Sequence, residues 1–116
     1  MTIPDDVKTA AELYQSLSED ELFRTLVSED DEAAFSEGGR LARGREIFQS
    51  IWREVGPLFC RYHRASGKTF GDQVSAIALL ATPLLGNPSF QGVSVVAFTA
   101  LAVKIGAEKL CGSLRA

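Results

Sequence analysis

QVSAIALLATPLLGNPSFQGVSVVAFTALAV, residues 73–103, contains no Asp, Glu, Lys or Arg. It divides into two apolar blocks, residues 74–86 and 90–103, separated by the turn signal Asn87-Pro88-Ser89. At about 1.5 Å of rise per residue, a helix made from either block spans about 20 Å, short of the ~30 Å hydrocarbon core of a bilayer. The stretch therefore predicts an apolar helical hairpin that forms the core of the fold. The alternative is a membrane-active hairpin that inserts into a bilayer.

The hairpin is expected to occupy residues 70–110. Thr69 is the expected N-cap of its first helix, which covers residues 70–85. Asn87 or Ser89 is expected to cap the second helix, which runs to about residue 110.

Two short acidic helices are predicted within residues 5–28. The first covers residues 5–16, where apolar side chains recur at helical spacing. The second begins after Ser18, because Glu21 follows three residues later and completes a capping box.

The longest predicted helix covers residues 40–65. Its apolar side chains are spaced four, three, four and three residues apart: Phe48, Trp52, Val55, Phe59 and Tyr62. Pro57 removes one intrahelical hydrogen bond, so a kink or a break is expected there. Residues 36–39, Ser-Glu-Gly-Gly, predict a flexible joint before this helix.

Together these patterns predict one all-α domain over residues 1–116, with about five helices and the apolar hairpin at its centre. The chain of 116 residues is long enough to bury such a core.

Charge is distributed unevenly along the chain. Residues 1–37 contain eleven acidic and two basic residues, whereas residues 38–68 contain seven basic and two acidic ones. The two regions are expected either to face each other or to form separate patches for a partner. The predicted interaction surface comprises Arg40, Arg43, Arg45, Arg53, Arg61, Arg64, Glu29, Asp30, Asp31 and Glu32. The net charge of −3 disfavours nucleic acid as the partner.

The two cysteines, Cys60 and Cys111, lie in apolar helical context and are predicted to be buried free thiols in a reducing compartment. The N-terminus has acids where a signal peptide needs basic residues, which predicts a cytoplasmic protein. Cys60 and His63 could also meet on one helix as a catalytic or zinc pair. A zinc site needs further ligands beside these two residues, and a cysteine nucleophile needs a third group to orient the histidine. Neither is evident in the sequence, so no enzyme activity, metal or cofactor is predicted.

Residues 97–111, AFTALAVKIGAEKLC, resemble the C-terminal tails of small helical proteins that accompany bacterial conflict (antiphage) systems. In those systems such proteins act as accessory or effector-associated modules. The resemblance implies a protein-interaction role beside an effector, and it assigns no functional residue. The predicted function is thus a non-enzymatic adaptor or a self-associating helical module, whose partner is another protein or a second copy of itself.

Overall fold

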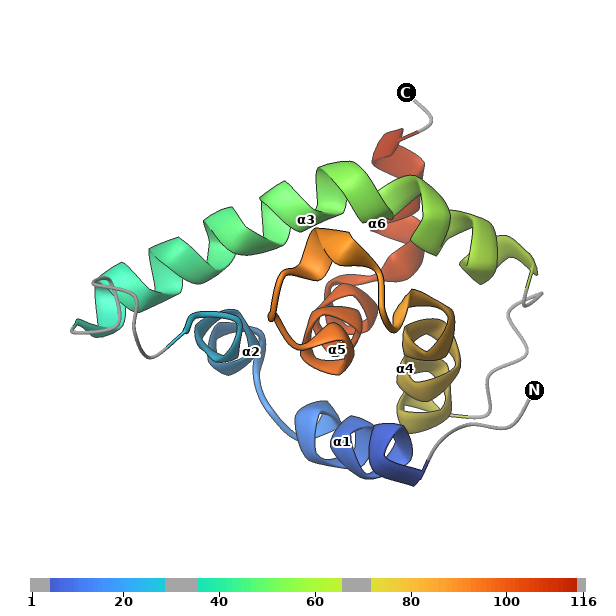
Figure 1. The fold of residues 1–116 in the computed structure, drawn as a ribbon, viewed down its shortest axis with the longest axis horizontal. Helices are drawn as coiled ribbons and strands as arrows, with labels where there is room; N and C mark the ends of the chain where they lie inside the picture. The colour runs from blue at the N-terminus through green and yellow to red at the C-terminus, as the bar shows by residue number, and fades with distance from the viewer. Residues whose placement is uncertain (1–4, 29–35, 66–71, 115–116) are drawn as a thin grey trace.

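The computed structural model describes residues 5–28, 36–65 and 72–114, and every regular element in these ranges is helical (Figure 1). The elements are α1 (Asp5–Gln15), α2 (Glu19–Thr25), α3 (Glu37–Ala65), α4 (Gln73–Ala81), α5 (Val95–Ile105) and α6 (Ala107–Leu114), with short 3₁₀ turns at Thr82–Leu84 and Pro88–Phe90. The predicted all-α class is confirmed.

The apolar helix α5 lies at the centre of the fold. Figure 1 shows it with α1 below, α2 and α4 on either side, and α3 across the top. Seven of its eleven residues, Val96–Ala102 in sequence order, are buried. A helix that is apolar on all sides needs this enclosure, because any exposed side would leave apolar surface in water.

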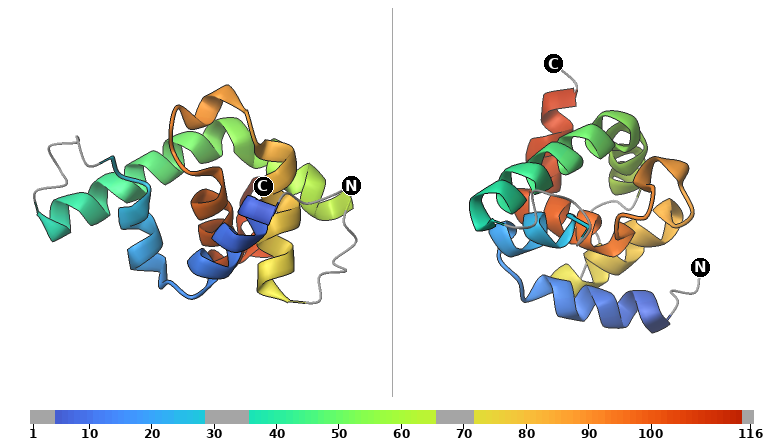
Figure 2. Two further views of the ribbon diagram at one scale, coloured as in Figure 1. Left: turned by 60° about the horizontal axis from the view of Figure 1, so that its bottom comes forward. Right: turned by 60° about the vertical axis from the view of Figure 1, so that its left-hand side comes forward.

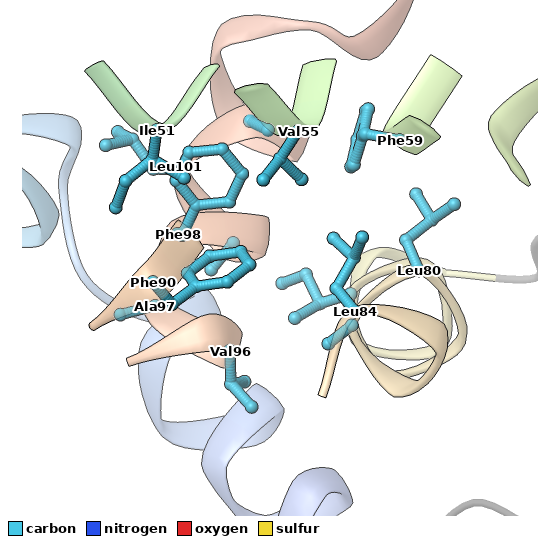
Figure 3. Close-up of a cluster of buried hydrophobic side chains, with 14 of the residues drawn as sticks. Ile51, Val55, Phe59, Leu80, Leu84, Phe90, Val96, Ala97, Phe98 and Leu101 are labelled. Atoms are coloured by element: carbon cyan, nitrogen blue, oxygen red, sulfur yellow. The ribbon is translucent and has the colours of Figure 1, made fainter. Parts of the chain in front are cut away.

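The long helix α3 contributes the upper side of the core. Ile51, Val55 and Phe59 point down from it towards α4 and α5 (Figure 3). The ring centroid of Phe98 in α5 lies 4.9 Å from that of Phe48 and 5.2 Å from that of Phe90. Phe48 and Trp52 of the predicted aromatic stripe therefore pack on Phe98 of the central helix.

Pro57 lies inside α3 without breaking it, because the helix is continuous over 29 residues. Figure 1 shows α3 as a bent rather than a straight helix, as expected for a helix that contains proline. The Pro57 side chain is exposed, so the interruption falls away from the core.

Several predicted helix starts are wrong. The joint expected at residues 36–39 is the first turn of α3, in which the Gly39 N–H donates to the Ser36 hydroxyl oxygen at 3.1 Å. The first hairpin helix begins later than expected, at Gln73, with Asp72 as its N-cap. Thr69 lies outside the described residues.

The second hairpin helix also begins later than predicted. Asn87 caps only the 3₁₀ turn Pro88–Phe90. Ser94 is the N-cap of α5, and its hydroxyl accepts from the Ala97 N–H at 3.1 Å. The predicted capping box of α2, formed by Ser18 and Glu21, is confirmed.

The predicted last helix divides at Gly106 into α5 and α6. Gly106 has φ +119°, a backbone conformation that residues with a Cβ atom rarely adopt. The chain changes direction there, and α6 lies against α3 (Figure 2, right).

Cys60 in α3 and Cys111 in α6 form a disulfide, so the prediction of free thiols is wrong. The residues are 51 positions apart, and α6 reaches α3 after the turn at Gly106. Since disulfides are typical of oxidising compartments, Cys60 and Cys111 no longer favour a reducing compartment.

No helix in the described ranges is both long enough and apolar enough to cross a membrane.

Candidate functional site

The predicted arginine surface begins with Arg40, which is used to hold α2 against α3. Its guanidinium Nε donates to the Arg24 carbonyl oxygen at 3.0 Å, and one terminal nitrogen donates to the Val27 carbonyl oxygen at 3.3 Å. These carbonyls lie at or just beyond the C-terminal end of α2, where the helix has no further backbone N–H groups to donate to them. Arg40 therefore acts as a cap for a neighbouring helix.

Arg45 also contacts α2. Its guanidinium lies 3.8 Å from the Asp20 carboxylate and its Cζ lies 5.6 Å from the centroid of the Phe23 ring. Acidic α2 thus faces the basic first half of α3, which is one of the two arrangements that the charge distribution allowed. The Arg45 and Asp20 side chains are 55% and 54% exposed, so the ion pair is weak and can exchange with a ligand.

The remaining arginines spread along α3. Arg43 pairs with Glu46 at 3.2 Å, and Arg64 donates from Nε to the Cys60 carbonyl oxygen at 3.4 Å. Arg53 and Arg61 are exposed. The acidic part of the predicted surface, Glu29, Asp30, Asp31 and Glu32, lies outside the described residues.

A groove runs between α2, α3 and the α5–α6 junction. Its volume is about 450 Å³, and its lining is Phe23, Arg45, Phe48, Gln49, Trp52, Arg53, Ile105 and Leu110. The ring of Trp52 stacks on that of Phe48, with centroids 6.0 Å apart and planes inclined by 12°. The groove therefore has an aromatic and aliphatic floor with two arginines among its lining residues.

Phe23, Trp52, Ile105 and Leu110 are only partly buried. Large apolar side chains in this state retain surface that a partner can cover. Tryptophan and arginine are also the residues that most often dominate binding energy at protein interfaces.

A second and larger hollow lies on the opposite flank of α3. Its volume is about 930 Å³, and its lining includes Tyr14, Val27, Ile47, Glu54 and Val93. The Arg43–Glu46 pair lies in its wall, so its surface is a mixture of apolar, acidic and basic side chains. This mixture favours no single ligand chemistry.

Cys60 and His63 do not form a reactive pair. Cys60 is bonded to Cys111 and has no thiol to act as a nucleophile or a zinc ligand. Within the described ranges, no group of three or more His, Cys, Asp or Glu side chains is placed to hold a metal ion.

Arg45 and Arg53 were predicted to lie on the interaction surface, whereas Phe23, Trp52, Ile105 and Leu110 were not. The last two enter the groove because the chain turns at Gly106. A glycine within a predicted helix was the available signal for that turn.

Comparisons of the chain with family models, with curated proteins and with solved structures find no match.

Proposed function

We propose that this protein is a non-enzymatic interaction module whose groove between α3 and the α5–α6 junction binds an amphipathic helix with acidic residues beside its apolar side. The observation behind this proposal is the combination of Phe23, Trp52 and Leu110 with Arg45 and Arg53 in one groove. Helices that bind in grooves present apolar anchors at i, i+3, i+4 and i+7.

The positive charges of Arg45 and Arg53 favour an amphipathic helix with acidic residues over one with neutral or basic residues. Arg53 is exposed, and Arg45 contacts only the Phe23 ring and a half-exposed Asp20 carboxylate among the interactions described above. Carboxylates on the ligand would pair with both guanidiniums, and basic ligands would be repelled. Binding should therefore weaken as the salt concentration rises.

The test uses a synthetic helical peptide with leucines at the anchor positions and glutamates beside them. Trp52 is the only tryptophan in the chain, so its fluorescence reports directly on the groove. Fluorescence titration should show saturable binding to the wild-type protein. A peptide with lysines in place of the glutamates should bind at least about tenfold more weakly, equivalent to 1.4 kcal/mol.

Two exposed arginines of α3 provide a matched pair of variants. Arg53 lines the groove and Arg61 does not. Arg53→Glu should weaken binding of the acidic peptide by about tenfold, whereas Arg61→Glu should leave it nearly unchanged. Equal effects of the two substitutions, or no saturable binding by wild type, would overturn the proposal.

The membrane-active alternative stays a prediction, and the structure adds no observation in its favour. The inserting hairpin would have to remove α5 from its contacts with α1, α2 and α4. The predicted cytoplasmic location and the role beside a bacterial defence effector also remain predictions, and the Cys60–Cys111 disulfide favours a more oxidising location.

A further inference from the structure

The groove and the disulfide share helix α6. Leu110 is the one groove residue that α6 contributes, and it lies in the same lining as Trp52. The next residue along the chain, Cys111, is bonded to Cys60 of α3. The crosslink therefore fixes the helix that provides part of the apolar lining of the groove.

The buried contact of α6 with the rest of the fold is centred on the crosslink. Among residues 107–112, whose burial is described, only Cys111 is buried, while Ala107 and Leu110 are partly buried. Figure 1 shows α6 crossing α3 and projecting beyond it, on the side away from α1. The helix has eight residues, and helices shorter than about 12 residues are marginal in water unless packing holds them.

The neighbouring helix α5 is held quite differently. Seven of its eleven residues are buried in the core. Gly106, at φ +119°, separates the two helices, so they are distinct elements rather than one rod. Segments with few buried apolar contacts open at a lower free-energy cost than the whole protein does. Without the crosslink, α6 can therefore leave α3 while the core around α5 stays folded.

Resting on the proposed function, we infer that the Cys60–Cys111 disulfide is a redox switch for the groove. In the oxidised protein the crosslink holds α6 on α3, and Leu110 completes the apolar lining that contains Trp52. Reduction releases α6, removes Leu110 from the groove and weakens binding of the acidic amphipathic helix. The protein thus binds its ligand under oxidising conditions and releases it under reducing ones.

The reductant is a dithiol. One of its thiolates attacks the Cys111 Sγ and forms a mixed disulfide, while the Cys60 Sγ leaves as a thiolate and takes up a proton. The second thiolate of the reductant then attacks the reductant sulfur of the mixed disulfide and frees Cys111 as a thiol. Two electrons and two protons pass from the dithiol, which becomes a disulfide, to the two cysteines. Cys111 is the point of attack because it lies on the helix that opens, whereas Cys60 lies within the continuous helix α3.

The first test compares peptide binding by the two redox states. A cysteine-free acidic peptide is titrated into the oxidised full chain and into the same protein in excess dithiothreitol, with Trp52 fluorescence as the signal. Reduction should raise the dissociation constant at least about tenfold. The Cys60→Ala/Cys111→Ala variant should bind as weakly as reduced wild type and should not respond to dithiothreitol. A wild-type dissociation constant that is unchanged by reduction would overturn the inference.

Hydrogen exchange distinguishes release of α6 from unfolding of the whole protein. The Leu110 N–H donates to the Gly106 carbonyl oxygen at 3.0 Å in the first turn of α6. Reduction should remove the protection of this amide and of the amides that follow it in α6, while the amides of α4 and α5 stay protected. Retained protection in α6, or an equal loss in α5, would contradict a local switch.

A substitution in α6 tests whether the crosslink acts through Leu110. Leu110→Ala should weaken binding by the oxidised protein, and reduction should then weaken it by less than about threefold more, because the two changes remove the same contact. Leu85→Ala is the matched control, since Leu85 is an exposed leucine outside the groove. It should respond to reduction as wild type does. A further loss of about tenfold on reducing Leu110→Ala would refute the switch, because the crosslink would then act on the groove by another route.

The outcomes also separate this inference from the proposed function. An oxidised protein that binds the acidic peptide through Arg53, and whose affinity and α6 protection are unchanged by reduction, refutes the switch and leaves the groove as a binding site. An oxidised protein that binds no peptide refutes the proposed function and the switch together.

Discussion

The backbone of Phe23 in α2 crosses Gly44 in α3 so closely that a Cβ on Gly44 would overlap the Phe23 carbonyl oxygen and lie 2.5 Å from its carbon. Backbone atoms cannot rotate away as a side chain can. This contact fixes the distance between α2 and α3, and with it one wall of the groove that contains Phe23 and Arg45.

Gly44→Ala should therefore destabilise the protein although alanine favours helices. Displacing α2 should cost about 1–3 kcal/mol, as overpacking does elsewhere. Chemical denaturation measures the loss. Gly38→Ala in the same helix is the control, because a Cβ there meets no atom within 4 Å. It should leave stability unchanged or slightly higher, and equal losses at the two positions would contradict the close approach.

Reduction of the Cys60–Cys111 disulfide should lower stability by up to about 4 kcal/mol, because the open chain regains the entropy of a loop of this length. The crosslink joins positions 51 residues apart. Thermal unfolding with and without reductant measures the effect. A Cys60→Ala/Cys111→Ala variant should unfold at a lower temperature than oxidised wild type and should not respond to reductant. An unchanged wild-type transition would show that the crosslink does not constrain the unfolded chain.

Phe98→Ala should remove the aromatic centre of the core. Phe98 is fully buried and contacts Phe48 and Phe90 at 4.9 and 5.2 Å between centroids. The cavity should cost about 3–5 kcal/mol, measured by chemical denaturation. Leu85→Ala, at a position that is 43% exposed, should cost less than about 1 kcal/mol. A small loss at Phe98 would mean that neighbouring side chains close the cavity.

Two helix caps should make stability depend on pH at the acid end. The Ser18 N–H donates to Glu21 and lowers the pKa of that carboxyl below its ordinary value, and the Ser75 N–H donates to Asp72 and lowers its pKa in the same way. A lowered folded-state pKa means that the stabilisation is present above the unfolded pKa and is lost as pH falls through the folded one.

The measurement is the free energy of unfolding between pH 7 and pH 2. The double variant Glu21→Gln/Asp72→Asn keeps both acceptor oxygens but removes their titration. It should lose less stability than wild type as pH falls below about 5. Identical pH profiles would show that these caps do not depend on the carboxylate charge.

Much of the secondary structure followed from local patterns. The Ser18–Glu21 capping box needs residues only three positions apart, so its geometry is implied by the helix itself. The aromatic spacing of α3 also predicted which side faces the core. The starts of α4 and α5 were misplaced because several serine, threonine, asparagine and aspartate residues near each start could cap.

The candidate groove was less predictable. Arg45 and Arg53 were included through their charge, but Arg40 belonged to the same pattern and instead caps α2. Local sequence does not distinguish an arginine that caps a neighbouring helix from one that faces solvent, because the difference depends on which helix lies beside it.

The sequence by itself predicted an all-α protein whose uncharged stretch, residues 73–103, must be removed from water, and it left open whether protein or lipid encloses that stretch. Only the tertiary structure decided where the helices around α5 leave a groove on the surface. The turn at Gly106 brings Cys111 to Cys60 and Leu110 to the groove beside Trp52. The members of these two pairs are 51 and 58 positions apart in the sequence, so their proximity depends on the packing of whole helices rather than on local spacing.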